Sequence, residues 1–337
     1  MSERRDKPII AIAAGDPAGI GPEISLKAAL DANVRKACLP ILVCDRGVVE
    51  RHAKTCGIKA DLRVITAAGE AAEVYINLID CPQPDAAALD FGASDAAAGR
   101  ASLAFAGAAI KAALAGEADA VVAAPQNETS IAHAGIAFDG YPSFVARATG
   151  THEQDVFLML CFGEIKIVHA TLHQSVRQAL AMITCERVGA AIRGADRALK
   201  RLGATAPKIA VSGLNPHAGE GGLFGREEIE IITPAIDAAA ADGIAVSGPF
   251  GADTMFARRG VDAFVVMLHD QGHIAAKLLA PNATAALTIG SPILFSSVAH
   301  GSAHDIAGKG VASAAAMIEA VLLMAKVRKA SLPQGYD

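Results

Sequence analysis

The sequence predicts an α/β protein built from two lobes, and three observations support this fold class. The chain has 337 residues, whereas one domain usually holds about 100 to 200 residues. Short apolar runs alternate with longer alanine-rich stretches, which is the pattern of a mostly parallel sheet covered by helices. Hydrophobic residues make up 52% of the chain and charged residues only 19%, so there is enough apolar material for two cores.

Each expected element follows from this alternation. Six short apolar runs predict buried strands, at 8–14, 40–44, 118–123, 165–171, 208–214 and 263–268. Five longer stretches predict helices, at 22–32, 97–115, 185–202, 227–241 and 312–327. In the last of these, apolar residues such as Ile318 and Leu322 recur at the helical period, so one face packs inward. Chain breakers at 81–84 and glycines at 219–225 predict loops.

Charge and hydropathy indicate which partners to expect. A net charge of −5 and a pI near 6.1 argue against nucleic acid, which binds clustered basic residues. The apolar stretch near the N-terminus is interrupted by Asp16, so it is expected to be a strand rather than a leader segment. The apolar stretch near the C-terminus carries Glu319 and is shorter than the roughly 20 residues that cross a bilayer. We therefore expect a cytoplasmic protein without membrane segments.

The six cysteines form no Cys-x-x-Cys pair. This spacing suits neither a thiolate metal site nor a redox motif. We expect reduced, mostly buried thiols.

Three histidines occupy equivalent local settings. His173, His217 and His269 each follow shortly after an apolar run that is expected to be a buried strand. Ligands of α/β proteins bind beyond the carboxyl ends of parallel strands, where three imidazoles can converge. Such a set suits a divalent ion, Zn²⁺ first, with Co²⁺, Fe²⁺, Ni²⁺ or Mg²⁺ as alternatives. The competing interpretation is that each is an ordinary loop histidine.

A helix is expected to start at His269, and its first turns carry further polar side chains. Asp270, His273 and Lys277 follow at spacings that place them on one helix face. An ammonium at this position can bind a substrate carboxylate, or donate a proton if it is desolvated. A solvated surface lysine is the alternative interpretation of Lys277.

A glycine-rich turn follows the first expected strand. Gly15, Gly19 and Gly21 precede Pro22, which suits the first turn of a helix. Backbone N–H groups at such a helix start can approach an anion. The spacing is not the Gly-x-Gly-x-x-Gly dinucleotide fingerprint. A tight turn from strand to helix explains the glycines equally well.

Seven sequence motifs are spread along most of the chain. They are GDPAGIGPE (15–23), AGIAFDGYPSF (134–144), TLH (171–173), LNPHAGEGGLFGREE (214–228), GADTMF (251–256), HDQGHIAAK (269–277) and HGSAHDIAGKG (300–310). These motifs resemble those of the 4-hydroxythreonine-4-phosphate dehydrogenases and their relatives. Their length and specificity make membership of this family the expectation.

The resemblance implies a fold, a cofactor set and candidate site residues. It implies an isocitrate-dehydrogenase-like fold with a cleft between a first lobe (1–125 plus 306–337) and a second lobe (126–305) that carries the dimer interface. It implies a homodimer with active sites at the subunit interface, NAD as oxidant, and a β-hydroxy acid that is oxidised and then loses CO₂. The metal ligands would be His173, His217 and His269. The catalytic candidates are Lys277, Asp270 and Asp253.

Several polar residues that hold the phosphorylated substrate in this family are replaced here. The residues at these positions are Gln126, Asn127, Tyr141, Ser143, Ala286, Phe295 and Ala299. Phe295 stands where the resemblance implies a substrate-binding arginine. Losing an arginine from a phosphate site removes charge-assisted hydrogen bonds worth roughly 1.5–3 kcal/mol each. Tyr141, Ser143, Gln126 and Lys277 are the substrate-binding candidates, although Tyr141 could equally be structural.

The replacements indicate a small carboxylate substrate without a phosphate. Gly-Tyr-Pro-Ser at 140–143 and the segments at 155–162, 172–177 and 268–282 resemble the terephthalate-pathway dihydrodiol dehydrogenases of the family. Those enzymes convert a cis-dihydroxycyclohexadiene dicarboxylate to protocatechuate. Two alternatives stay open: a dehydrogenase of 4-hydroxythreonine 4-phosphate or of another phosphorylated sugar acid, and a binding or regulatory relative without activity.

Overall fold

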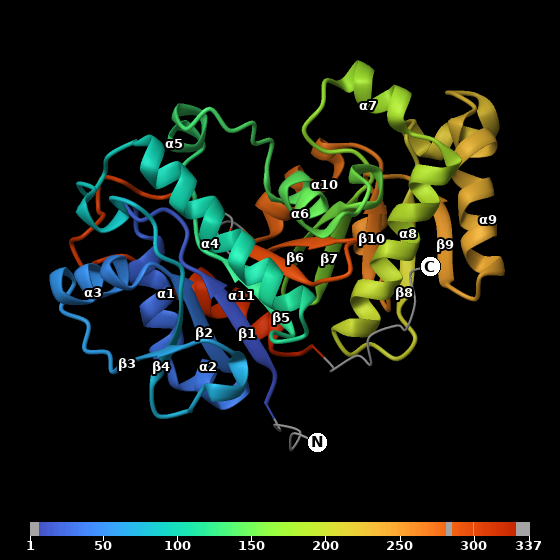
Figure 1. Ribbon diagram of the computed structural model, residues 1–337. Helices are drawn as coiled ribbons and strands as arrows, with labels where there is room; N and C mark the ends of the chain where they lie inside the picture. The colour runs from blue at the N-terminus through green and yellow to red at the C-terminus, as the bar shows by residue number, and fades with distance from the viewer. Residues whose placement is uncertain (1–6, 281–284, 299, 328–337) are drawn as a thin grey trace. The chain divides into compact units, whose positions relative to one another are not determined.

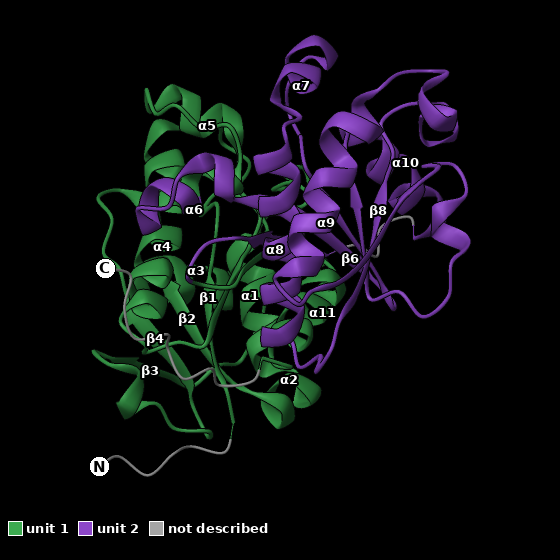
Figure 2. Ribbon diagram, turned by 90° about the vertical axis from the view of Figure 1, so that its right-hand side faces the viewer, with its two compact units in different colours: residues 1–144, 293–337 green, residues 145–292 purple. Residues whose placement is uncertain are grey.

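The computed structural model describes residues 7–280, 285–298 and 300–327 and divides the chain into two compact units. Unit 1 comprises residues 1–144 and 293–337, and unit 2 comprises residues 145–292 (Figure 2). Each unit contains parallel strands and packed helices, so the expected α/β class is confirmed. In the described part of the chain, no helix is both long enough and apolar enough to span a membrane.

Unit 1 contains a six-stranded parallel segment of sheet in the order β3-β4-β2-β1-β5-β12 (Figure 1). Its strands are β1 (Ile9–Ala13), β2 (Leu39–Cys44), β3 (Leu62–Ile65), β4 (Ile76–Asp80), β5 (Ala120–Ala123) and β12 (Phe295–Val298). Its helices are α1 (Gly21–Leu30), α2 (Ala32–Ala37), α3 (Arg46–Thr55), α4 (Ala96–Leu114), α5 (Glu128–His133), α11 (Ala315–Met324), η1 (Ala68–Glu70) and η2 (Ala86–Ala88), and α6 (Tyr141–Thr149) begins here. Strands β2 and β5 are buried along their whole length, as strands covered on both faces require.

Unit 2 contains the strand order β11-β6-β7-β10-β8-β9, parallel from β7 to β9 and antiparallel at β11, β6 and β7. Its strands are β6 (Phe157–Phe162), β7 (Ile165–His169), β8 (Lys208–Ser212), β9 (Ala245–Phe250), β10 (Ala263–Val266) and β11 (Ala285–Ile289). Its helices are α7 (Val176–Met182), α8 (Cys185–Arg201), α9 (Thr233–Ala241), α10 (His269–Leu279), η3 (Glu153–Asp155), η4 (Pro216–Gly222), η5 (Glu228–Ile232) and η6 (Met255–Ala257).

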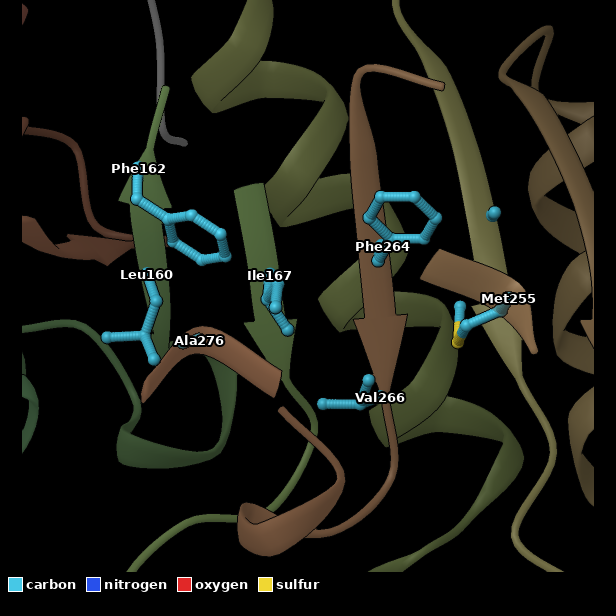
Figure 3. Close-up of a cluster of buried hydrophobic side chains, with 8 residues drawn as sticks. Leu160, Phe162, Ile167, Met255, Phe264, Val266 and Ala276 are labelled. Atoms are coloured by element: carbon cyan, nitrogen blue, oxygen red, sulfur yellow. The ribbon is translucent and has the colours of Figure 1, made fainter. Parts of the chain in front are cut away.

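The core of unit 2 fixes the position of α10 against the sheet. Ala276 of this helix is 1% exposed and packs in one cluster with side chains of β6, β7, β8, β10 and η6 (Figure 3). The other members are Leu160, Phe162, Ile167, Ala210, Met255, Phe264 and Val266. Because Ala276 faces the sheet, the polar residues Asp270 and Lys277 are left exposed.

The six expected strands and five expected helices are all present, with ends shifted by a few residues. Helix 227–241 is divided into a π-helical turn, η5, and α9. Strands β3, β4, β6, β9, β11 and β12 were not expected. The sequence analysis also gave no expectation for the short helices α2, α3, α5, α6 and α7.

The units divide after Phe144 and before Ile293, rather than after residue 125 and before residue 306 as expected for the lobes. The segment between 126 and 144 packs with unit 1. Asn127 caps α5, and Gly99 of α4 lies so close to Ser130 that an added Cβ would be 2.2 Å from its carbonyl oxygen. The Tyr141 ring lies 4.8 Å from Phe295 of β12.

The glycine-rich turn after β1 is explained by close packing of the backbone. A Cβ on Gly15 would lie 2.2 Å from the carbonyl oxygen of Pro125, and a Cβ on Gly21 would lie 2.2 Å from that of Ala14. Gly15 also has a φ of +71°. These contacts favour the tight-turn interpretation over an anion site.

We predict that Gly15→Ala destabilises the protein strongly, because the new Cβ must displace backbone and the residue stays left-handed. The expected loss in free energy of unfolding is about 3 kcal/mol, measured by urea denaturation. Gly57→Ala is the matched control, since Gly57 has a φ of +66° but nothing within 4 Å of its added Cβ. Its expected loss is about 1 kcal/mol. Equal losses in both variants would contradict the packing argument.

Candidate active site

Two of the three predicted metal ligands lie close together. His173 follows β7, and His269 begins α10 after β10, the parallel neighbour of β7. Their ring centroids are 5.7 Å apart. Since β7 and β10 run in the same direction, both histidines lie beyond the carboxyl ends of their strands, as the sequence predicted.

His217 lies on the loop after β8, the other parallel neighbour of β10. Its side chain contacts that loop: Nδ1 is 3.3 Å from an oxygen of Glu220, and the ring is 6.0 Å from that of Phe224. Among the residues that the structure describes, no three His, Cys, Asp or Glu side chains are arranged to hold a metal ion. The chain therefore brings the rings of His173 and His269 together, whereas the contacts of the His217 side chain are with Glu220 and Phe224 of its own loop.

The loop that carries His217 has an unusual backbone. Five consecutive residues, His217 to Gly221, have positive φ, and three of them are not glycine. The buried carboxylate of Glu228 holds this loop by accepting hydrogen bonds from the backbone N–H groups of Leu214 and Asn215, both 2.7 Å, and from the Asn215 amide. Burial raises the pKa of Glu228, but these hydrogen bonds outweigh it and leave the pKa below its ordinary value. Glu228 was not among the site residues expected from the sequence.

His269 belongs to a cluster of imidazoles. Its ring stacks on that of His273 at 3.8 Å between centroids and 9° between planes, and His169 lies 4.6 Å from His273. Burial, with the nearby histidines, lowers the pKa of His273 to about 4 and that of His169 to about 3. Both rings are therefore neutral at pH 7. His169, the last residue of β7, was not among the site residues expected from the sequence.

The chemistry of His173 and His269 fits a divalent ion. The Asp270 carboxylate lies 2.6 Å from Nδ1 of His269 and accepts a hydrogen bond from the N–H at that position; in the neutral ring this leaves the lone pair on Nε2. Metal-bound histidines commonly have this carboxylate partner, which fixes the tautomer and ring orientation. A third ligand has to come from outside this pair.

The catalytic candidates differ in their surroundings. Lys277 is exposed in the last turn of α10, and its charge contributes to the lowered pKa of His273, one turn earlier. Exposure favours a cation that binds a carboxylate over a desolvated proton donor. Asp253 is exposed in the loop after β9.

The substrate-binding candidates of unit 1 lie around β5 and the start of α6. Tyr141 is 9% exposed, its hydroxyl donates to the carbonyl oxygen of Ala124, and burial raises its pKa. The burial and hydrogen bond of Tyr141 are those of a residue that supports the fold, which was the alternative to substrate binding that the sequence left open. Ser143 is half-buried in the first turn of α6. The side-chain oxygen of Gln126 is buried without a hydrogen-bond partner.

A further polar cluster in unit 1 joins two of the family motifs. The carboxylate of Asp16, which is 1% exposed, accepts a hydrogen bond of 2.7 Å from Nε2 of His304. Asn127 Nδ2 lies 3.5 Å from the same nitrogen. Asp16 was noted in the sequence only as an interruption of an apolar run, and its partner lies 288 residues away.

Two of the other positions at which the resemblance implies a replaced polar residue, 286 and 295, lie in apolar surroundings. Phe295 is fully buried. Ala286 packs against the apolar cluster of Figure 3. Ala299 lies outside the described residues.

The cysteines of the described chain are free thiols, of which Cys38, Cys44 and Cys161 are buried.

The structure is that of a two-unit α/β protein with polar side chains beyond its strand ends, which is where enzymes of this fold class bind their ligands. A family model described as pyridoxal phosphate biosynthetic protein PdxA matches residues 36–324. The chain belongs to this family and is a dehydrogenase of it. The resemblance seen in the sequence motifs is thereby confirmed.

Two curated relatives cover nearly the whole chain. The 1,2-dihydroxy-3,5-cyclohexadiene-1,4-dicarboxylate dehydrogenase of a Comamonas species is 44% identical over 94% of this chain and 96% of its own length. A protein of Symbiobacterium thermophilum, whose name gives D-threonate 4-phosphate dehydrogenase as its proposed activity, is 43% identical over 95% and 96%.

The similar solved structures likewise include a dehydrogenase named for a phosphorylated compound and one named for a dihydrodiol. A 4-hydroxythreonine-4-phosphate dehydrogenase from Klebsiella pneumoniae superposes with a TM-score of 0.84 at 38% identity, covering 94% of this chain and 99% of its own. A terephthalate 1,2-cis-dihydrodiol dehydrogenase from Burkholderia xenovorans gives a TM-score of 0.76 at 43% identity, covering 95% and 98%. Similarity therefore establishes the family but not the substrate.

We predict that Glu228→Gln loosens the His217 loop, because an amide cannot accept all the hydrogen bonds of the carboxylate. The expected loss in free energy of unfolding at pH 7 is about 2 kcal/mol. The pKa of Glu228 is lowered in the folded state. Its carboxylate therefore contributes fully to stability above the unfolded-state pKa of about 4.3, and this contribution is lost as pH falls through the lower folded-state pKa. Thermal unfolding from pH 7 to pH 3 should therefore show a smaller acid-induced loss of stability in the variant.

Glu230→Gln is the matched control for this prediction. Glu230 pairs with Arg226, but both side chains are more than half exposed. Removing such a pair costs at most about 1 kcal/mol. If Glu228→Gln were no more destabilising than Glu230→Gln, the proposed clamp on the loop would be wrong.

Proposed function

We propose that this dehydrogenase uses NAD and a divalent ion to oxidise and decarboxylate a cis-dihydrodiol dicarboxylate, converting the terephthalate dihydrodiol to protocatechuate. The observation that carries the proposal is the packing of Phe295. The resemblance implies an arginine for a phosphorylated substrate at this position, whereas here the side chain is fully buried against the ring of Tyr141. An apolar core at this point offers a phosphate no counter-charge.

The proposed substrate matches the charges that the chain retains. Lys277 supplies an exposed ammonium that would bind one carboxylate of the dicarboxylate. His173 and His269 would hold the ion, which when bound withdraws charge from the substrate oxygens. Asp270 would keep the ring of His269 in place, and Asp253 and Asp270 are candidates to take up the hydroxyl proton.

The reaction is balanced with NAD as the oxidant. A C–H bond of the diol breaks and its hydride passes to NAD, while the hydroxyl proton leaves to a base. The bond from the ring to the carboxylate that is β to the new carbonyl then breaks, and CO₂ is released. The electron pair returns to the ring, so that gain of aromaticity favours the forward direction.

The partner that we propose is a second copy of the chain. Ile274, Leu278 and Leu279 of α10 are 56%, 77% and 57% exposed beside the histidine cluster. Leu223 and Phe224, in the loop that carries His217, are also exposed. Such apolar surface supports the homodimer that the resemblance implies. A site at that interface would allow His217 of one copy to complete the ligand set of the other.

The second candidate function is oxidation of a phosphorylated hydroxy acid such as 4-hydroxythreonine 4-phosphate. The relatives and solved structures that act on such compounds favour it, since their identity to the chain is nearly as high. The buried Phe295 argues against it.

We predict that the purified protein forms NADH from the terephthalate dihydrodiol only when NAD and a divalent metal are both present. The kcat/KM for 4-hydroxythreonine 4-phosphate should be at least about 100-fold lower, the effect of losing roughly 3 kcal/mol of charge-assisted hydrogen bonding. The measurement is NADH absorbance across a substrate panel, with the product identified by mass. Faster oxidation of the phosphorylated substrate would reverse the assignment.

We also predict that His217→Ala and His269→Ala lose bound metal and turnover together. Activity should fall more than about 100-fold, beyond the effect of removing an outer partner of a ligand. Metal content by elemental analysis and NADH formation are measured on the same samples. His133→Ala, an exposed histidine of unit 1, is the control and should retain both. Full metal content in His217→Ala would remove this residue from the ligand set.

A further inference from the structure

We propose that His169 and His273 are positioning residues that hold the ring of His269 in the orientation needed to bind the ion. This inference rests on the proposed function, because that proposal makes His269 a metal ligand. The inference goes beyond the proposed function because it assigns a role to two imidazoles that are not themselves proposed as metal ligands.

His273 covers one face of the His269 ring. The two rings are stacked, 3.8 Å apart and 9° from parallel. Nδ1 of His273 donates to the backbone carbonyl oxygen of His269 at 3.3 Å. His273 is therefore tied to the residue whose ring it covers, and a rotation of the His269 ring away from this plane would break the stack.

His169 supports His273 from the sheet side. Its ring is 1% exposed, lies 4.6 Å from that of His273, and has Nδ1 directed at the carbonyl oxygen of Leu158 at 3.4 Å. A Cβ on Gly272 would lie 2.3 Å from Nε2 of His169. The backbone of α10 thus approaches the His169 ring so closely that only glycine fits between them.

Together with Asp270, these contacts constrain His269 from two directions. The carboxylate of Asp270 holds Nδ1 in the plane of the ring, at 2.6 Å, and His273 lies against its face. A carboxylate alone leaves the ring free to turn about the axis of their hydrogen bond. The stack removes that freedom, and His169 keeps the stack from moving toward the sheet.

The test is a Co²⁺ titration of the full-length protein followed by visible absorption. His273→Leu replaces the imidazole by an apolar side chain of similar volume and so removes the aromatic stack, and we expect it to weaken Co²⁺ binding about 10- to 100-fold. His273→Phe restores a stacked ring and should return the Kd close to that of the unchanged protein. Gly272→Ala, which displaces His169, should weaken binding like His273→Leu. His133→Ala is the matched histidine deletion and should leave the Kd unchanged.

The outcomes separate this inference from the proposed function. Far-UV circular dichroism and thermal unfolding without metal show whether each variant is folded. If the unchanged protein binds Co²⁺ and folded His273→Leu binds it equally well, the positioning role is wrong while the metal site stands. If His273→Phe is as weak as His273→Leu, stacking is not the means of positioning. If the unchanged protein binds no Co²⁺, the proposed metal site fails and this inference fails with it.

Discussion

The parallel pairing of β7, β10 and β8 is the constraint on which the candidate site depends. The carboxyl-terminal halves of all three strands are buried, and each pair is in register over three residues. Parallel strands end at the same edge, so the segments that follow them must begin side by side. His173, His217 and His269 lie three to five residues beyond these ends because the chain leaves the sheet there. The site thus follows from strand direction before any side-chain contact forms.

The strands that could be predicted are those whose residues are almost continuously apolar. Strands such as β5 and β10 are buried on both faces, which leaves an unmistakable run in the sequence. Among the strands that were not expected, β6 (Phe157–Phe162) is an equally continuous apolar run, whereas others lack this signal for different reasons. β3 has exposed residues, β9 contains Gly248-Pro249, and β12 contains Ser296 and Ser297. Their strand conformation is set by their neighbours in the sheet rather than by local pattern.

The residues of the candidate site also divide into those that local sequence predicts and those that only long-range contacts reveal. The histidines after strands could be found because their setting is local, and α10 could be expected from helical spacing. Glu228, His169 and the pair of Asp16 with His304 could not. Each acts through a contact with a distant segment, and a glutamate or histidine in isolation has no signature of the partner that it will meet. Their burial is tolerated because hydrogen bonds and ion pairs compensate for most of the lost solvation.

Two of the positions at which the resemblance implies a replaced polar residue, 141 and 295, are in direct contact with each other. Tyr141 and Phe295 come from segments more than 150 residues apart and pack ring against ring, with the Tyr141 hydroxyl bonded to the backbone of Ala124. An arginine at 295 would place a charge in this apolar contact, at a cost of several kcal/mol without a partner. Restoring a phosphate-binding arginine would therefore also require changing Tyr141. The substrate preference that we propose would thus depend on the core of unit 1, and changing it would take paired substitutions at 141 and 295 rather than a single one.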